Sequence, residues 1–528
     1  MRVLVSFLMT LVILYHASRT CGNSLVPDQD AGPAPDSHWE LFLDDHIITR
    51  STGFQRVVHH PEPRGIVLEG TESWEEPRGV TPLYVGRRQD SGYEMYYRAH
   101  GSIGAVTAYA LSDDGIHWEK PNLGLVDTPW GKENNLVPCK QPRDLLLHGN
   151  VRDPSKRFVF CHDDRTKNGV YFASQPLDFI NDPHAIKNLV DTGGHLGCNH
   201  NTVEFWDDIH NEWVAMRQAP NHPPVRCGGR YSSASDLIDW KLDHFLYPDT
   251  NDSTDPRYFH EVYGIMSVHL EGIALGYAYW FIGDRTHSNP VLYEDGHDRP
   301  TTDEGLIGKS VCKGTMEVRI VASRDGGQTW DRTVSREPWI PHGKEQDSYD
   351  RCVRIDCPPL RMGEEDWFYC TGYDGDHCAA KYYNDRGYNV IRGTLYTQKH
   401  NRYVSLTAGN IGQILISKPI KVTGKTLQLN VDGSRGEVKV AIGIDKWLKH
   451  KNGNWPFKAK LPHWMVEDRW ERSHLENGFH FDDCEPVREN SIEYNIKWKD
   501  ASLESLLGQT VRLYILVQDA DLYGVRFK

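Results

Sequence analysis

Some carboxylates of this chain interrupt apolar or aromatic stretches, where an ionised side chain is costly unless it is exposed or used. Four acidic residues lie in such contexts: Asp44, Asp45, Glu204 and Glu261. A fifth candidate, Asp153, follows an arginine on a turn that Pro154 stiffens. Two carboxylates that flank a glycosidic bond can cleave it, because one acts as an acid while the other stays ionised as nucleophile or base. The five residues are therefore candidate catalytic groups for glycoside cleavage.

Each of these acids also has a structural interpretation. The pair Asp44–Asp45 in ELFLDDHII is compatible with an exposed strand end, and Asp153 with a simple turn before a strand. Glu204 in NHNTVEFWDD and Glu261 in RYFHEVYGIM are compatible with acids at the edge of the core, each paired with an arginine. At the level of the residues both interpretations remain open.

Polar and aromatic side chains are candidates for holding a sugar. The candidate substrate-binding residues are Arg152, Asp350, Arg351 and His377. Aromatic rings stack on the C–H faces of sugars, and four tryptophans occupy loop-like contexts: Trp74, Trp130, Trp280 and Trp339. The histidines lack HExxH or HxxEH spacing, so we predict no catalytic zinc and no cofactor, while a structural calcium is compatible with the sequence.

The elements that must position these residues repeat one theme. Pairs of alternating strands recur, as in YEMYYRAHG followed by TAYALSDDGIHW, and GIALGYAYWF followed by MEVRIVASRDGGQTW. About five such units fit before residue 400, at a spacing of roughly sixty to ninety residues. Repeated antiparallel units favour an all-β fold with a five-bladed β-propeller, and a two-sheet sandwich is the alternative.

The pattern changes near residue 401. Segments such as KTLQLNVDG and TVRLYILVQDADLYGVRF alternate apolar and polar residues with period two and lack the repeated turn. They predict a C-terminal β-sandwich over 401–528, following the propeller over 39–400. A propeller places functional residues at one end of its central channel, so we expect the candidate acids to converge there.

The stretch SRDGGQTW, residues 323–330, also holds an aspartate between turn residues. It fits the Ser-x-Asp-x-Gly-x-Thr-Trp pattern called the Asp box, and SDDGIHW and SASDLIDW are degraded copies. Asp and Ser side chains accept hydrogen bonds from turn amides, and glycine permits positive φ. Because the element recurs, we predict that Asp325 and Asp114 stabilise hairpins rather than perform chemistry.

In the order in which its candidate acids follow one another along the sequence, the chain resembles the five-bladed propeller glycosidases of glycoside hydrolase families 32 and 43, especially secreted family 32-like proteins. The resemblance implies that Asp44 or Asp45 is the nucleophile. It implies that Asp153, in the Arg-Asp-Pro string that begins at Arg152, stabilises the transition state. Glu204 would be the acid/base, and Glu261 is its rival for that role. A C-terminal sandwich is also typical of family 32.

The chain departs from that family at two motifs. The Trp-Met-Asn-Asp-Pro-Asn-Gly box is replaced by LFLDDHII, and Phe205 follows Glu204 where the family has a Glu-Cys pair. We therefore expect either a glycosidase with an altered oligo- or polysaccharide substrate, or a non-catalytic carbohydrate- or protein-binding propeller. A sialidase would need an ordered arginine triad, which we do not identify in the sequence.

Composition narrows the partners and the compartment. The 528 residues carry a net charge of −14, which argues against nucleic acid as a partner. Residues 1–22 fit a signal peptide, and residues 23–38 a flexible leader; no later segment is apolar enough to span a membrane. We therefore expect a secreted protein, in which some of the 11 cysteines form disulfides.

Overall fold

The computed structural model describes the chain after residue 38, with internal gaps. The described residues are 39–88, 91–137, 142–147, 158–164, 167–173, 190–191, 205–207, 209–219, 226–233, 241–253, 255–270, 272–284, 314–334, 336–345, 348–377, 388–444, 475–476 and 478–528. Over these residues the protein is all-β, with one short 3₁₀ helix, η5 (Leu503–Leu506). No helix in this described part is long and apolar enough to cross a membrane.

The strands before residue 400 form antiparallel groups. An 11-stranded sheet contains three of them. The first group is β5 (Pro77–Arg87), β6 (Tyr93–Gly101) and β7 (Gly104–Ser112), and the second is β16 (Tyr258–Leu270), β17 (Ile273–Asp284) and β18 (Gly314–Ser323). The third group is β19 (Cys352–Ile355), β20 (Leu360–Met362), β21 (Glu365–Tyr373) and β22 (Ile391–Lys399), together with β4 (Glu62–Leu68). Within this sheet, the parallel bridges Met316↔Cys352 and Ile391↔Gly79 join the three groups.

Two four-stranded sheets complete this lobe within the described ranges. One contains β8 (Pro142–Leu147), β9 (Phe158–Asp164), β10 (Lys167–Ala173) and β11 (Val190–Asp191). The other contains β12 (Phe205–Asp207), β13 (Glu212–Gln218), β14 (Gly228–Ser233) and β15 (Lys241–Leu246). The antiparallel units that the sequence predicts before residue 400 are thus present as separate strand groups, in chain order.

Two further sheets form the C-terminal lobe. The six-stranded sheet contains β28 (Asn490–Asn495), β26 (Leu427–Asp432), β30 (Ala520–Phe527), β23 (Val404–Ala408), β3 (Gln55–Val58) and β1 (Glu40–Leu41). The five-stranded sheet contains β2 (Ile48–Ser51), β24 (Gln413–Ser417), β29 (Thr510–Gln518), β25 (Ile420–Lys421) and β27 (Glu437–Ile444). Buried residues of both sheets, including Leu429, Val431 and Ile515, form one apolar cluster.

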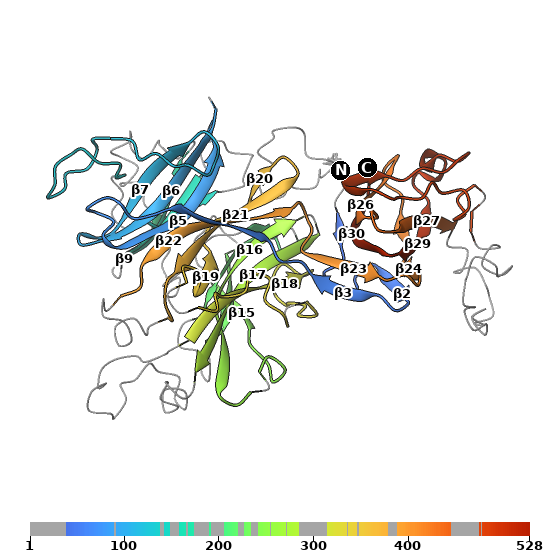
Figure 1. Cartoon of the computed structure of the whole chain (residues 1–528), viewed down its shortest axis with the longest axis horizontal. Helices are drawn as coiled ribbons and strands as arrows, with labels where there is room; N and C mark the ends of the chain where they lie inside the picture. The colour runs from blue at the N-terminus through green and yellow to red at the C-terminus, as the bar shows by residue number, and fades with distance from the viewer. Residues whose placement is uncertain are drawn as a thin grey trace, which may run out of the picture.

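The first described segment belongs to the C-terminal lobe. Figure 1 shows β2 and β3, in blue, beside the orange and red strands of that lobe. The pairings are β1 with β30, β2 with β24 and β3 with β23. This differs from the predicted propeller domain over 39–400, because the partner strands lie far along the chain where local patterning cannot identify them.

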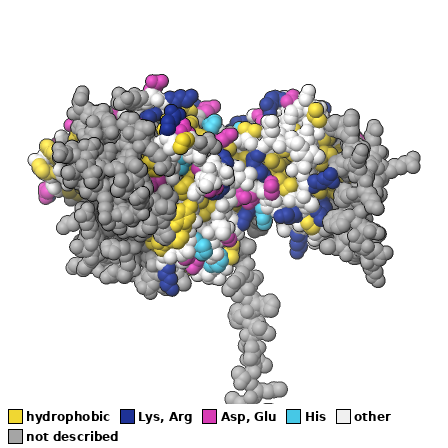
Figure 2. Space-filling model, turned by 90° about the horizontal axis from the view of Figure 1, so that it is seen from below, with side chains coloured by type: hydrophobic (Ala, Val, Ile, Leu, Met, Phe, Trp, Pro, Cys, Tyr) yellow, Lys and Arg dark blue, Asp and Glu magenta, His cyan; other side chains and the backbone are white. Residues whose placement is uncertain are grey.

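Residues 41–43 lie between the two lobes. Successive side chains of an extended segment point in opposite directions. Leu41 and Leu43 are buried in the apolar cluster that includes Met266 and Phe368, whereas Phe42 is buried in the C-terminal cluster. One short segment therefore contributes to both cores. In the space-filling view, positive and negative side chains are interspersed over the described surface (Figure 2).

Candidate functional site

Three of the predicted site residues lie outside the described residues. These are Arg152, Asp153 and Glu204. Their catalytic and substrate-binding roles therefore stay predictions. The remaining predicted residues divide between the junction of the lobes, one loop, and a cluster of charged and aromatic side chains in the larger lobe.

Asp44 forms an ion pair at the junction of the lobes. Its Oδ2 lies 2.9 Å from Nε of Arg324, and its Oδ1 accepts hydrogen bonds from Nη2 of Arg324 and the amide of His46. Burial raises the pKa of Asp44, but hydrogen bonding and the charge of Arg324 outweigh it, so the pKa is lowered. These contacts hold Asp44 at the lobe junction, and its role as nucleophile stays a prediction.

Asp45 is separate from that ion pair. Its side chain is 75% exposed and lies 2.6 Å from Nη2 of Arg56. The same arginine donates to the carbonyl oxygens of Phe42 and Asp44. No contact described in this part of the chain connects Asp44 or Asp45 with Glu261. The expected convergence of these three acids therefore stays a prediction.

Glu261 is the predicted acid that lies among other charged groups. Strand β16 places it opposite Phe281 of β17, and its side chain is 1% exposed. The amide of Arg226, just before β14, donates to Oε1 of Glu261 at 3.2 Å, and Nη1 of Arg226 lies 3.6 Å from Oε2. A guanidinium beside a buried carboxylate stabilises its ionised form.

Aromatic side chains link this ion pair to His377. The guanidinium carbon of Arg226 lies 5.1 Å from the ring centre of Tyr263, and Nε2 of His377 forms a 3.0 Å hydrogen bond with the Tyr263 hydroxyl. Burial, together with the charges of Arg226 and Arg354, lowers the pKa of His377 to about 3. His377 is therefore neutral at physiological pH, so it acts through hydrogen bonds and not as a cation.

Arg354 of β19 extends the cluster to β21. Its Nη2 lies 3.2 Å from Asp356 Oδ2, and its guanidinium carbon lies 5.3 Å from the centre of the Tyr373 ring. Burial disfavours the charged form of Arg354, but Asp356 and the nearby tyrosines outweigh burial, so its pKa is raised. Arg354 is therefore held as a permanent cation.

His100 of β6 is a second buried histidine. Its Nε2 is 3.0 Å from the Thr81 hydroxyl of β5. Burial lowers the pKa of His100 to about 3, and the charges of Arg98, Arg354 and Arg78 add to this effect. The charge of Arg354 thus helps to lower the pKa of both histidines, His100 on β6 and His377 just after β21.

Glu261 and His377 were identified from the sequence, but the arginines around them were not. Arg226 in PPVRCGGRY and Arg354 in CVRIDC are charged residues inside apolar runs. A charged residue within an apolar run is also the signal that identified the acids. The same signal, applied to basic residues, would have identified Arg226 and Arg354. We call the cluster of Arg226, Glu261, Tyr263 and His377 the arginine site.

The predicted binding residues Asp350 and Arg351 stabilise a neighbouring loop. Asp350 accepts a hydrogen bond from the Ser348 hydroxyl. Arg351 donates to Asp376 at 2.6 Å and to the carbonyl of Gly343 at 2.9 Å. Asp376 directly precedes His377, so Arg351 fixes the loop that carries this histidine, and its role in substrate binding stays a prediction.

Three of the four candidate tryptophan platforms are buried. Trp280 and Trp339 have no exposed area and Trp74 is 7% exposed, so their rings are packed inside the lobe. The guanidinium carbons of Arg319 and Arg332 lie 4.6 and 4.8 Å from the Trp280 ring. Among these four residues, only Trp130, at 47% exposure, offers a ring to a sugar.

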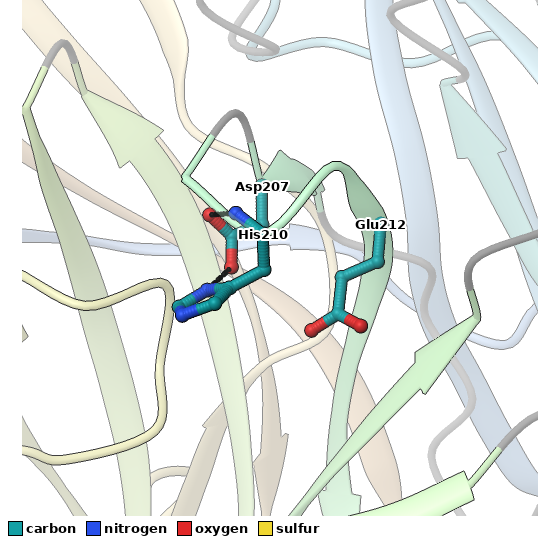
Figure 3. Close-up of side chains that lie close together, drawn as sticks. All are labelled: Asp207, His210 and Glu212. Carbon is teal, nitrogen blue, oxygen red and sulfur yellow. Dashed lines mark hydrogen bonds and ion pairs between the residues drawn. The ribbon is translucent and has the colours of Figure 1, made fainter.

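Three side chains of types that bind metal ions lie close together at β12 and β13. Asp207, His210 and Glu212 present ligand atoms within 4.8 Å of one another, and Figure 3 shows the Asp207–His210 hydrogen bond. Nη2 of the fully buried Arg230 already contacts both carboxylates, at 3.1 Å to Asp207 and 2.7 Å to Glu212. A second cation would be repelled there, so this cluster is an ion-pair network that does not fit a metal.

Residues 323–330 make the hydrogen bonds expected of a structural turn. The Ser323 hydroxyl accepts from the amide of Gly327, and Asp325 Oδ1 accepts from the amide of Thr329, both at 2.8 Å. Gly326 has a φ of 66°, and a Cβ there would lie 2.0 Å from Asp207 Oδ2. Asp114 forms the equivalent bonds to the amides of residues 116 and 117. The third copy, SASDLIDW, extends outside the described residues.

The described cysteines form no disulfide. Cys227, Cys352, Cys357, Cys370 and Cys484 are buried free thiols. Burial raises the pKa of Cys227 and Cys484 to about 11, which keeps both protonated. Cys352, Cys357 and Cys370, which lie near one another in the sequence, are separate thiols in the core. The disulfide prediction now concerns only cysteines whose side chains the structure does not describe.

No family model matches the chain, and no curated protein matches its sequence. Several solved structures that match the chain are carbohydrate-active enzymes. An N-acetylgalactosamine deacetylase from F. plautii matches with 11% identity and a TM-score of 0.38, covering 66% of this chain and 96% of that one. An α-L-arabinofuranosidase from Podospora anserina matches with 10% identity and a TM-score of 0.36, covering 65% and 98%. A β-fructofuranosidase from Schwanniomyces occidentalis matches with 10% identity and a TM-score of 0.34, covering 89% and 97%. At these TM-scores the matches assign neither fold nor activity.

Proposed function

We propose that the protein is a glycoside hydrolase that acts on an oligo- or polysaccharide at the arginine site. In this proposal the strand groups before residue 400 are the five blades of a propeller, and the two C-terminal sheets are a β-sandwich. One observation carries the proposal. Glu261, a buried carboxylate on β16, pairs with Arg226 just before β14. Arg226 in turn contacts the ring of Tyr263, whose hydroxyl bonds His377 in the loop after β21.

Glu261 suits the role of the ionised carboxylate. Arg226 lies 3.6 Å from its Oε2, and a neighbouring cation stabilises the charged form that a nucleophile or base requires. The sequence had placed Glu261 as an alternative acid, and the ion pair favours the opposite role. The proton donor is then one of the acids outside the described residues, Asp153 or Glu204. Export through the N-terminal signal pattern is part of the same proposal.

Hydrolysis assays on matched variants test the proposal. Purified protein is screened on nitrophenyl glycosides and on polysaccharides with detection of new reducing ends. We expect Glu261→Gln to lower kcat by about 10²-fold or more, because the amide cannot carry the negative charge. Asp44→Asn is the control, and we expect its kcat within about threefold of the wild type, because Asp44 binds Arg324 at the lobe junction.

Two outcomes would contradict this assignment. Full activity in a folded Glu261→Gln variant would remove Glu261 from the reaction. Loss of activity in Asp44→Asn with an unchanged melting temperature would return the nucleophile role to Asp44. Circular dichroism and thermal unfolding of both variants separate these outcomes from misfolding.

The alternative is a non-catalytic carbohydrate-binding propeller. The 1% exposure of the Glu261 side chain favours it, because an acid that attacks a substrate must touch it. This alternative predicts saccharide binding by the wild type without any hydrolysis, and equal binding by Glu261→Gln within about twofold. Hydrolysis that disappears in Glu261→Gln excludes it.

A further inference from the structure

One sequence motif that the proposed function does not use is an acceptor signal for N-linked glycans. The signal is Asn-x-Ser or Asn-x-Thr, in which the middle residue is not proline. Asn251, Asp252 and Ser253 form such a triplet, and it is the only one in the 528 residues. A three-residue string arises easily by chance, so the surroundings of the asparagine decide whether it can carry a glycan.

The triplet belongs to a turn between β15 and β16 whose backbone is fixed without the Asn251 side chain. The amide of Asp252 donates to the carbonyl oxygen of Asp249 at 3.1 Å, and the amide of Asn251 donates to Oδ1 of Asp249 at 2.8 Å. In return, the amide of Asp249 donates to Oδ2 of Asp252 at 2.6 Å. Aspartate side chains commonly close turns in this way. None of these bonds uses the carboxamide of Asn251.

Asp252 anchors this turn to the larger lobe. Its side chain is 1% exposed, and its Oδ1 pairs with Arg332, with Arg336 at 3.0 Å and with Arg319 at 3.4 Å. Several cationic partners offset the cost of burying a carboxylate. Because the middle residue of the triplet is fixed inside the lobe, the turn holds the preceding Asn251 at a defined place on the surface.

Asn251 itself is exposed, although the neighbouring Asp252 side chain is buried. The Ser253 hydroxyl donates to the carbonyl oxygen of Asp255 at 3.0 Å, which is a bond within the same loop. An N-linked glycan is bulky and solubilising, so it needs an asparagine at the surface. Among the described contacts of this loop, none involves the Asn251 carboxamide, and a glycan there would displace no contact of the fold.

We propose that Asn251 is glycosylated during export of the chain. The inference rests on the export that forms part of the proposed function, and it does not depend on the hydrolase activity. In the transfer, Nδ2 of Asn251 forms a bond to the anomeric carbon of a lipid-linked oligosaccharide diphosphate. The bond between that carbon and the diphosphate oxygen breaks, the lipid diphosphate leaves, and the carboxamide loses one proton. The attached glycan then extends from the turn into solvent.

Expression of the full chain in a secreting eukaryotic cell line tests the proposal. The medium and the cell lysate are both analysed, with and without a peptide N-glycanase, which removes N-linked glycans and converts the glycosylated asparagine to aspartate. We expect the wild-type chain in the medium to lose mass in a single step on this treatment. Mass spectrometry of the resulting peptides should locate the new aspartate at position 251.

Variants connect the glycan to the triplet. Asn251→Gln and Ser253→Ala should each abolish the mass loss, whereas Ser253→Thr should preserve it, because the required hydroxyl remains. Asn410→Gln is the matched control, since Asn410 is also exposed but is followed by Ile-Gly and so lies outside such a triplet. Its mass loss should equal that of the wild type. Ser253→Ala leaves Asn251 in place, so it keeps the test valid if Asn251→Gln does not fold.

Three outcomes overturn the inference. They are a secreted wild-type chain that the glycanase does not change, a mass loss that persists in Asn251→Gln, and a wild-type chain that stays in the cytosol without a glycan. The failure of the proposed function looks different. If the glycan depends on Asn251 but the secreted protein hydrolyses no glycoside, only the hydrolase proposal falls. If hydrolysis depends on Glu261 and the secreted chain carries no glycan, only the glycosylation inference falls.

Discussion

Arg230 illustrates how one buried cation can organise a strand group. Its Nη1 lies 2.6 Å from Asp243, its Nη2 contacts Asp207 and Glu212, and its Nε donates to the carbonyl of Gly326 at 2.7 Å. Removing a charge from water is costly, and only complete pairing offsets that cost. Because Gly326 belongs to the turn after β18, the same guanidinium also connects β14 to the next strand group.

Arg230→Met should therefore destabilise the fold strongly. The apolar side chain leaves three carboxylates near one another without their cation, and we expect the free energy of unfolding to fall by about 3–5 kcal/mol. Urea denaturation followed by tryptophan fluorescence measures this change. Arg435→Met is the control, since Arg435 is 55% exposed and pairs only with Asp521 among the described ion pairs. Its effect should stay below about 1 kcal/mol, and a similar effect of both substitutions would contradict the argument.

Asp366 is a second buried acid, and its environment acts in the opposite sense to that of Asp44. Burial raises its pKa to about 7, although Arg361 and the amide of Asn401 lower it. Oδ1 also lies 2.9 Å from Nδ1 of His400. A raised pKa means that the folded protein binds a proton that the unfolded chain has lost. This contribution to stability is complete below pH 3.8 and is lost as the pH rises through about 7.

Asp366→Asn should remove that pH dependence. The amide is neutral at every pH and has nearly the same shape, so the wild type should lose stability relative to the variant by about 1.4 kcal/mol per pH unit between pH 4 and 7. Parallel urea titrations of both proteins at several pH values measure the difference. A difference that stays constant from pH 4 to 7 would show that Asp366 does not titrate in this range.

At the scale of elements, the segment before β2 acts as a joint. Leu41 and Leu43 enter the core of the larger lobe, Phe42 enters the core of the C-terminal lobe, and Asp44 binds Arg324. The period of two in an extended segment makes this division possible. Because Arg324 follows β18 directly, the ion pair fixes the segment at the end of that strand.

Phe42→Ala tests the joint. Phe42 has no exposed area, so truncation leaves a cavity in the C-terminal core, and we expect unfolding to become easier by about 3–5 kcal/mol. Ile411→Ala, at a residue that is 64% exposed, should change stability by less than about 0.5 kcal/mol. Differential scanning calorimetry measures both variants. A loss in Phe42→Ala no larger than in the control would remove this residue from the joint.

The sequence could predict strands and turns but not their distant partners. Period-two alternation and the Ser-Asp-Gly turns are local, so the all-β fold and the bonds of Asp325 could be predicted. Asp44 carries the same local signal as Glu261, and their difference depends on Arg324, 280 residues away from Asp44. A local sequence pattern does not show which distant residue will pair with an acid. The pairing of β3 with β23 was missed for the same reason.

At the scale of the whole molecule, buried neutral histidines set the response to acid. Burial lowers the pKa of His100 and His377 to about 3, and arginine charges reinforce the effect. Between pH 6.5 and 3 the unfolded chain therefore binds protons at these two positions that the folded protein does not. Stability contributed by the two histidines is present above pH 6.5 and is lost as the pH falls toward 3. Asp366 acts in the opposite direction over part of this range.

His100→Gln separates the histidine contribution from that of Asp366. Glutamine can still bond the Thr81 hydroxyl but does not titrate in the neighbourhood of Arg78, Arg98 and Arg354. From pH 6.5 to 4 the wild type should lose about 1.4 kcal/mol per pH unit more than the variant. Urea unfolding at matched ionic strength gives the two slopes. Parallel slopes would mean that His100 is protonated in the folded protein, and the three arginines would then not converge on it.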